Sequence, residues 1–294
     1  MKKYIGEIML CITAIIWGSG FVASAISLDH YTPYQILAGR FLVGFIILSI
    51  IFNKKLKGLN RGVIKKGIVL GFFLYFAFIL QTVGLQYTTP SKNAFLTAVN
   101  VVIVPFIAYL AYKRKIDKFE LSGAILAIIG IGFLSLQLSL DVNVGDLLTL
   151  ACAVAFAYHI FYTAKYVKDE DPILLTIVQM FVAALLGWIV ILFKGEIVNL
   201  SLEGEAISAI LYLGVFSTTI AYLFQTIAQK FTNETKAAII LSTESFWGMM
   251  FSVLFIGEVL TTRMIIGAIL ILIAIIISET KLSFMRKKSI EKLT

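Results

Sequence analysis

Two charged side chains interrupt long apolar runs of this chain, and their types suggest chemistry. Arg40 lies about six residues, or on the order of 9 Å of helix, inside one run, and Glu244 lies about ten residues inside another, near the middle of a bilayer. An ionised side chain at mid-membrane costs roughly 2.5 to 3.5 kcal/mol, so each predicts a partner or an aqueous cavity. Arg40 could hold a carboxylate by a bidentate contact, unless it snorkels to the lipid headgroups. Glu244 could carry a coupling proton, pair with Arg40, hold an ammonium group or form a structural hydrogen bond.

Further polar and aromatic residues inside apolar runs are candidates for contact with a small molecule. An indole well inside a span can stack on a planar or apolar ligand, and a histidine can relay protons near neutral pH. Packing is the alternative for the histidine, and hydrogen bonds between helices are the alternative for the amides. The predicted substrate-binding residues are Trp17, Arg40, Gln81, Asn100, Tyr158, His159, Gln179, Gln225 and Glu244, and Glu244 is the candidate for the coupling proton.

The sequence contains no constellation typical of an enzyme, a cofactor site or a metal centre. Only two histidines are present, His30 and His159, too few for a histidine-rich iron or zinc site. Ser19 stands between two glycines as in an intramembrane serine protease, but no base is predicted near it. Cys11 and Cys152 fall inside apolar runs, and no phosphate-binding loop occurs. We therefore predict no catalytic residue, cofactor or metal ion, and an integral-membrane enzyme is the rival class.

The elements that must position these residues are apolar runs long enough to be transmembrane helices. Hydrophobic residues form 60% of the chain, charged residues 14%, and the mean hydropathy is +0.95, which excludes an ordinary soluble domain. Each run has roughly the 17 to 25 residues that a helix needs to cross a bilayer, and none alternates as a barrel strand does. The predicted fold is an all-α polytopic membrane protein with ten transmembrane helices: Tyr4–Ser27, Tyr34–Phe52, Gly67–Tyr87, Ala94–Tyr112, Leu121–Leu138, Gly145–Ala164, Leu174–Phe193, Ala206–Gln229, Lys236–Ile256 and Met264–Ser278.

The basic residues predict the orientation of these helices. With alternating loops assigned to opposite sides, 21 of the 25 Lys and Arg residues fall on one side. By the positive-inside rule both termini are cytoplasmic, and the protein is placed in the plasma or inner membrane. The net charge of +8 then reflects topology rather than nucleic-acid binding. The first run is predicted to be a helix and not a cleaved signal peptide, because its counterpart in the second half is an internal span.

The two halves of the chain resemble each other. At an offset of 139 residues Gly6 aligns with Gly145 and Pro33 with Pro172, and at an offset of 144 residues Gln81 aligns with Gln225. Each half has five predicted helices, and because five is odd the second half must be inverted in the membrane. Inverted repeats are typical of secondary transporters that work by alternating access, with the substrate between the halves. The predicted units are residues 1–138, residues 139–285 and a basic cytoplasmic tail, 286–294.

The motifs along these spans resemble the ten-helix EamA-type members of the drug/metabolite transporter superfamily. Over nearly the whole chain, the resemblance is carried by Trp17-Gly18-Ser19, Pro33 followed by Arg40, Gln86-Tyr87-Thr88, Ser91-Lys92-Asn93-Ala94, Pro105, Gly123-Ala124, Glu244 and Gly257-Glu258. Two departures are Ser245, where the family pattern usually has proline, and Arg114, where it often has glutamate. The resemblance implies a central cavity lined by helices one to four and six to nine, with helices five and ten peripheral and a possible homodimer contact.

The resemblance also implies the function. It implies export of amino acids or related small metabolites across the lipid bilayer, although the family also includes importers and carriers of sugars or nucleotide-sugars, and family membership does not choose among these substrates. No nucleic-acid partner is predicted. The alternative is a broad exporter of cationic or aromatic compounds that uses Glu244 and Trp17 without Arg40. A channel is disfavoured because the sequence lacks a carbonyl-filter signature.

Overall fold

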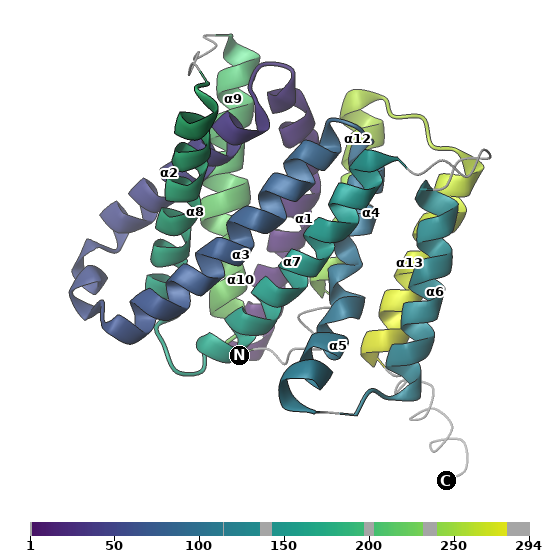
Figure 1. Ribbon diagram of the computed structural model, residues 1–294, viewed down its shortest axis with the longest axis horizontal. Helices are drawn as coiled ribbons and strands as arrows, with labels where there is room; N and C mark the ends of the chain where they lie inside the picture. The colour runs from purple at the N-terminus through teal and green to yellow at the C-terminus, as the bar shows by residue number, and fades with distance from the viewer. Residues whose placement is uncertain (1, 114, 136–142, 197–202, 232–239, 281–294) are drawn as a thin grey trace.

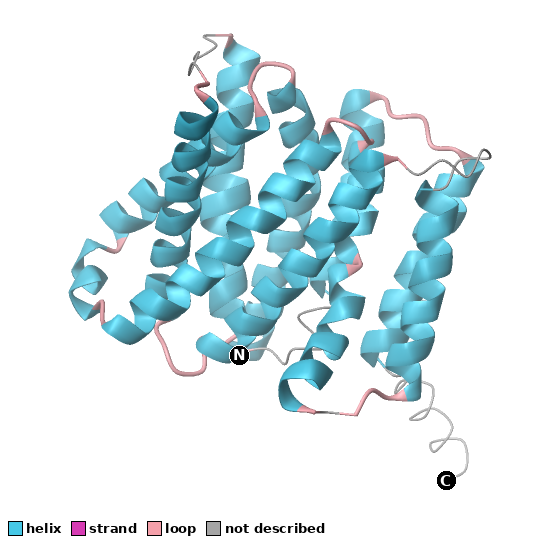
Figure 2. Cartoon of the chain, in the orientation of Figure 1, coloured by secondary structure: helices cyan, strands magenta, loops and turns pink. Residues whose placement is uncertain are grey.

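The computed structural model describes residues 2–113, 115–135, 143–196, 203–231 and 240–280, and these parts are helices joined by turns and loops (Figure 1, Figure 2). The predicted tail, 286–294, lies outside the described residues. The first half contains α1 (Lys2–Leu28), α2 (Pro33–Ile51), the short η1 (Asn53–Gly58), α3 (Arg61–Leu85), α4 (Pro90–Ala98), α5 (Asn100–Tyr112) and α6 (Lys118–Ser135). The second contains α7 (Val144–Tyr166), α8 (Pro172–Lys194), α9 (Gly204–Tyr212), the π-helix η2 (Leu213–Ile220), α10 (Ala221–Ala228), α12 (Glu244–Ile256) and α13 (Thr262–Thr280).

The all-α membrane fold is confirmed, although the exact number of spans stays a prediction. Seven helices of the described residues are long and apolar enough to cross a membrane: Tyr4–Leu28, Pro33–Ile51, Arg61–Leu85, Pro90–Tyr112, Val144–Tyr166, Pro172–Lys194 and Gly204–Ala228. Two shorter apolar helices follow, Ile240–Ile256 and Thr262–Ser278. The predicted ninth span starts at Lys236, which lies outside the described residues. The end of the predicted fifth span, Leu138, also lies outside them.

Local sequence explains where equivalent helices begin. Pro33 and Pro172, which align in the repeat, each stand in the first turn of a helix, where a missing N–H costs nothing. Thr32 caps α2 by accepting a hydrogen bond from the Gln35 backbone N–H. Asp171 caps α8 in the same way. The two halves therefore enter their second helices by the same device.

The packing of the helices follows the two-fold repeat. α3 packs on α7, and its counterpart, formed by α9, η2 and α10, packs on α1. α2 packs on its own counterpart α8, and α6 packs on its own counterpart α13. In Figure 1 the α6–α13 pair stands at one side of the bundle, away from α1 and α8. This arrangement leaves the centre of the bundle to the remaining helices of both halves.

Glycines make the α6–α13 contact close and symmetric. A Cβ added at Gly123 would lie 2.8 Å from the Ala274 carbonyl oxygen, and one added at Gly267 would lie 2.8 Å from the Gly130 carbonyl oxygen. Gly123 and Gly267 align at the 144-residue offset, as do Gly130 and Ala274. Small residues let helix backbones approach in this way inside lipid, where no hydrophobic force drives helix association.

The predicted fourth and ninth spans are interrupted at equivalent residues. Val99 separates α4 from α5, and its N–H bonds to the Leu96 carbonyl three residues back. Thr243 occupies the equivalent repeat position and precedes α12, and its N–H donates to the Ile240 carbonyl three residues back. The apolar pattern predicted continuous helices here, because a one-residue tightening of the backbone leaves the hydrophobic run unbroken. Each interruption puts a polar residue, Asn100 or Glu244, at the start of the following helix.

Candidate functional site

A central cavity lies between the two halves. Its lining comes from α1, α2, α3, α4, α5, α7, η2, α10 and α12, whereas α6 and α13 contribute no lining residue. About 600 Å³ of empty space, open solvent included, lies between the lining residues. Seven of the nine predicted substrate-binding residues line it: Trp17, Arg40, Gln81, Asn100, His159, Gln225 and Glu244.

The other two predicted residues lie elsewhere. Gln179 is buried behind the lining, where its Oε1 atom lies 2.8 Å from the His159 Nε2 atom. Tyr158 stacks on Phe73 with ring centroids 5.3 Å apart and does not line the cavity. Phe156, His159 and Ile160 share the face of α7 that lines the cavity, because residues three or four apart lie on the same side of a helix. At about 100° per residue, Tyr158 falls on the opposite face.

Arg40 is fully buried, and its guanidinium contacts neutral groups. Its Nε atom donates to the Thr218 Oγ1 atom at 2.7 Å, and an Nη atom donates to the Ser217 Oγ atom at 3.1 Å. The guanidinium carbon lies 4.3 Å from the centroid of the Phe78 ring, a cation–π distance. None of the ion pairs between described residues includes Arg40. A buried cation without a counter-ion is costly, so this site favours an anionic ligand.

Glu244 lines the same cavity at the start of α12. Within the described part of the chain it has no hydrogen-bond or ion-pair partner, and the predicted alternative of a pair with Arg40 is not formed. Asn100, its repeat mate, starts α5, and the Oδ1 atom of Asn100 is also without a partner. Interrupted helices at equivalent positions of two inverted halves are typical of transporter binding sites, because half-helix ends point at the ligand.

Four aromatic side chains form a wall of the cavity. Trp17 packs on Tyr222 with ring centroids 5.0 Å apart, and Phe78 packs on Phe156 at 5.2 Å and on Tyr222 at 6.0 Å. Only Trp17 was predicted. The repeat carried a signal for the others, because Trp17 aligns with Phe156 and Phe78 aligns with Tyr222. The wall thus consists of two symmetry-related aromatic pairs, suited to apolar or planar ligand groups.

The π-helix η2 supplies polar groups that were not among the predicted site residues. Ser217 lines the cavity, and its carbonyl oxygen accepts a hydrogen bond from the Trp17 indole N–H at 3.1 Å. The available signal was the polar triplet at residues 217–219 within an otherwise apolar run.

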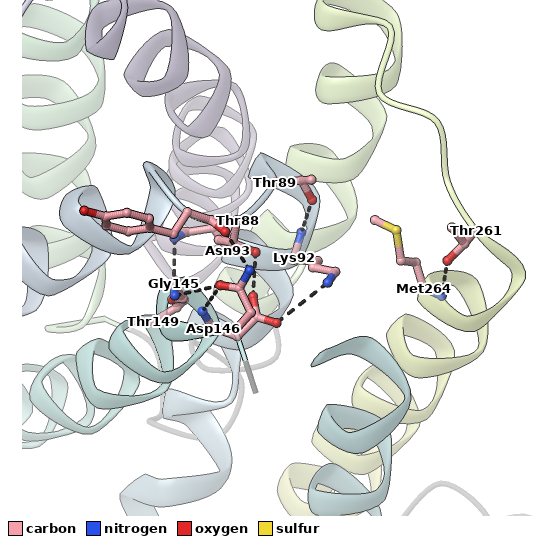
Figure 3. A network of polar contacts seen from close by, with 11 residues as sticks. Thr88, Thr89, Lys92, Asn93, Gly145, Asp146, Thr149, Thr261 and Met264 are labelled. Atoms are coloured by element: carbon pink, nitrogen blue, oxygen red, sulfur yellow. Dashed lines mark hydrogen bonds and ion pairs between the residues drawn. The ribbon is translucent and has the colours of Figure 1, made fainter. Parts of the chain in front are cut away.

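A buried polar network joins the cavity to the seam between the halves (Figure 3). The Asn93 amide lines the cavity and donates to the Thr149 hydroxyl at 2.9 Å. The neighbouring Lys92 forms an ion pair with the buried Asp146, with Nζ 3.7 Å from Oδ2, and the Thr88 hydroxyl donates to the other carboxylate oxygen. Lys92, Asn93 and Thr88 belong to the first half, whereas Asp146 and Thr149 belong to the second. The network therefore ties α4 to α7 across the repeat boundary.

The cavity is asymmetric along the bundle. Its lining reaches Ser24 and Leu85, near the ends of α1 and α3 that lie farthest from the N-terminus. Toward the N-terminal end, Leu10, Ala228 and Leu241 pack together as a buried apolar cluster next to Trp17. The cavity lining thus extends toward the end of the bundle opposite the N-terminus, and apolar packing lies toward the N-terminal end.

Comparison with known proteins agrees with this architecture. The EamA-like transporter family matches residues 4–136 and again residues 143–280. An uncharacterized transporter of Archaeoglobus fulgidus is 34% identical over 277 residues, covering 94% of this chain and 86% of its own. The uncharacterized transporter YyaM of Bacillus subtilis is 25% identical, covering 94% of each chain. A crystal structure with 15% identity superposes with a TM-score of 0.67 over 95% of this chain and 98% of its own, which shows a shared fold alone.

Proposed function

Because this chain belongs to the EamA-like transporter family, we propose that it is a secondary active carrier that exports amino acids or related zwitterionic metabolites by alternating access. The substrate occupies the central cavity between the repeats. Its carboxylate binds Arg40, its ammonium group binds Glu244, and its side chain packs on the aromatic wall.

The observation that carries this proposal is a pair of side chains of opposite charge type in one cavity that form no ion pair within the described residues. Arg40 and Glu244 both line the cavity, both are at least nine-tenths buried, and no ion pair joins them. Each buried charge loses its hydration, and this cost must be offset by a ligand or partner of opposite charge. A zwitterion compensates both at once, whereas a purely cationic or anionic substrate leaves one charge unpaired.

Glu244 is the group we assign to proton coupling. A carboxylate facing the cavity can hold either a proton or a substrate ammonium group, and this exclusivity couples the two movements. The His159 ring faces Gln179, which favours a positioning role for this histidine over a relay.

The second candidate is a broad exporter of cationic or aromatic compounds, favoured by the four-ring wall and Glu244. Such a carrier uses cation–π contacts and the carboxylate, and Arg40 then has only a structural role. The two candidates differ in what they predict for Arg40.

Counterflow in proteoliposomes separates the two candidates without knowledge of the driving gradient. Vesicles loaded with unlabelled amino acids should take up labelled amino acid, and Arg40→Ala should raise the half-saturation concentration by at least about tenfold because a hydrogen-bonded charge is lost. Arg263→Ala, at the start of α13 and outside the cavity lining, is the matched control and should behave as wild type. Amino-acid counterflow that survives Arg40→Ala, or its absence across an amino-acid panel beside uptake of organic cations, would favour the second candidate.

We also propose that the chain resides in the plasma or inner membrane with both termini in the cytoplasm. This orientation is supported by the excess of Lys and Arg in alternate loops. A homodimer is a further proposal, supported by the peripheral place of α6 and α13. Native mass spectrometry from detergent would show whether two copies associate.

A further inference from the structure

The π-helix η2 breaks the symmetry between the two halves. Its counterpart in the first half is the regular helix α3, in which Phe73 and Leu74 take the places of Ser217 and Thr218. A π-helix is uncommon, and its wider turn often occurs at functional sites. Here the wider turn lies against the guanidinium of Arg40.

Two hydroxyl groups of η2 hold the guanidinium from different sides. The Thr218 hydroxyl accepts from Nε, and Thr218 does not line the cavity. The Ser217 hydroxyl accepts from Nη and does line the cavity. Within the described residues no other hydrogen bond involves the Ser217 hydroxyl, so its own hydrogen is free to be donated. Arginine has five N–H groups, and the two contacts leave the others on both Nη atoms for a ligand.

A glycine provides the space for this arrangement. A Cβ added at Gly20 would lie 2.7 Å from the Ser217 hydroxyl oxygen, so a larger residue would displace the serine. In the other half the residue equivalent to Gly20 is His159, and the residue equivalent to Arg40 is Gln179; these two bond each other. The symmetric position is thus filled and neutral in one half, whereas it is open and cationic in the other.

We propose that Arg40 and Ser217 together form a carboxylate-binding site, with Thr218 as the positioning residue that fixes the plane of the guanidinium. The N–H groups on Nη and the Ser217 O–H donate to the two carboxylate oxygens of the ligand. This inference rests on the proposed function in one respect, that the carboxylate of the substrate binds at this site. The site also takes monocarboxylates that have no amino group. Charge-assisted hydrogen bonds of this kind are short and discriminate strongly against a neutral ligand of the same shape.

Binding of matched acids and amides to the purified protein tests the site apart from transport. Isothermal titration calorimetry with phenylacetate and phenylacetamide, and with propionate and propionamide, compares ligands that differ in charge but not in shape. Wild type should bind the acids at least about tenfold more tightly than the amides, since a hydrogen bond to a charged group is the stronger kind. Ser217→Ala should weaken acid binding by about tenfold and leave amide binding unchanged.

The positioning role of Thr218 has its own variants. Thr218→Val should weaken acid binding as Ser217→Ala does, and Thr218→Ser should restore it, because serine keeps the hydroxyl. The matched controls are Thr226→Val and Ser27→Ala, since each removes a buried hydroxyl that bonds only the backbone of its own helix. Both controls should bind acids as wild type does, and a monodisperse elution profile with an unchanged melting temperature shows that each variant folds.

Distinct outcomes overturn the site and the proposed function. Equal affinity of wild type for acid and amide in both pairs, wild-type acid binding by Ser217→Ala, or failure of Thr218→Ser to restore binding overturns the site. Acid selectivity that depends on Ser217, together with no amino-acid counterflow, keeps the site and overturns amino-acid carriage. Amino-acid counterflow with wild-type behaviour of Ser217→Ala keeps the carrier and overturns this site.

Discussion

At the scale of single residues, the proposed chemistry rests on two ionisable side chains, Arg40 and Glu244, that form no ion pair within the described part of the chain. Arg40 is held by hydroxyl groups and an aromatic ring, and Glu244 faces the cavity from the start of a helix. Both arrangements keep a charge buried yet available, which a mutual ion pair would prevent. Their separation is therefore a property of the site, and it is what a zwitterionic substrate would bridge.

Glu244→Gln should separate exchange from proton-driven movement. The amide cannot lose a proton, so counterflow should continue at a reduced rate while accumulation driven by a pH gradient should fall to background. Proteoliposomes assayed with and without an imposed pH gradient measure both. Glu205→Gln, an exposed glutamate in the first turn of α9, serves as the control. Retained accumulation in Glu244→Gln would remove the coupling role from this residue.

Asp171 should stabilise the fold in a pH-dependent way. Partial burial raises its pKa, but hydrogen bonds from Lys55 and from the Leu174 and Ile173 backbone N–H groups outweigh burial and leave the pKa below its ordinary value. A carboxylate with a lowered folded-state pKa contributes stability that is present above the unfolded-state pKa and lost as pH falls through the folded-state pKa.

Asp171→Asn keeps a good helix cap and removes the charge. At pH 7 it should cost about 0.5 to 1 kcal/mol, and the difference from wild type should disappear once pH falls below the lowered folded-state pKa of Asp171. Thermal unfolding across a pH series checks this, and a difference that is constant with pH would show that the charge is irrelevant.

At the scale of helices, equivalent elements of the two halves differ in their backbone geometry and in the polar groups that they place in the cavity. The fourth and ninth spans are interrupted at the same repeat position, yet one break presents an amide and the other a carboxylate. The third span is regular, whereas its counterpart contains η2. The repeat thus supplies two copies of a scaffold, and substitutions within one copy supply the polarity of the site.

The seam between α4 and α7 should depend on the Lys92–Asp146 ion pair. Asp146 is 1% exposed, so Asp146→Asn leaves Lys92 without its counter-ion and should destabilise the protein by about 3 kcal/mol. Asp169→Asn breaks an exposed pair with Lys66 and should cost less than about 1 kcal/mol. Thermal unfolding compares the two variants.

The double variant Asp146→Asn with Lys92→Met checks the cause. Removing both charges should recover part of the lost stability, as coupled residues do in a double-mutant cycle. Equal, small effects of Asp146→Asn and Asp169→Asn would contradict a structural role for the buried pair.

At the scale of the whole molecule, the cavity has lining toward one end and apolar packing toward the other. In the proposed alternating-access cycle, exchanging the conformations of the two halves moves access to the cavity to the opposite side of the membrane. The apolar cluster of Leu10, Ala228 and Leu241 is the packing that this proposal expects to separate.

Cysteine labelling should reveal the opening and its side. In a background without Cys11 and Cys152, Ser24→Cys should react with an impermeant thiol reagent added outside intact cells, and Leu10→Cys should not. Bound substrate should slow the reaction at Ser24→Cys, because the substrate and the reagent would occupy the same cavity. Labelling of Leu10→Cys and not Ser24→Cys from outside would reverse the proposed orientation.

The sequence by itself determined the features that depend on composition and spacing: the membrane fold, the two-fold repeat, and a set of polar residues that lipid does not tolerate without compensation. Seven of the nine predicted residues line one cavity because burial of a polar group in an apolar span already restricts where it can face. Only the tertiary structure decided which of these groups meet. Tyr158 points away from the cavity and Gln179 lies behind His159. Which face of a helix points into the cavity depends on how that helix packs against its neighbouring helices. Three further features depend on small backbone shifts and on distances between helices: the η2 turn, the two helix interruptions, and the lack of an ion pair between Arg40 and Glu244. The same apolar pattern is compatible with many different backbone shifts and helix distances, so the sequence pattern could not predict these features.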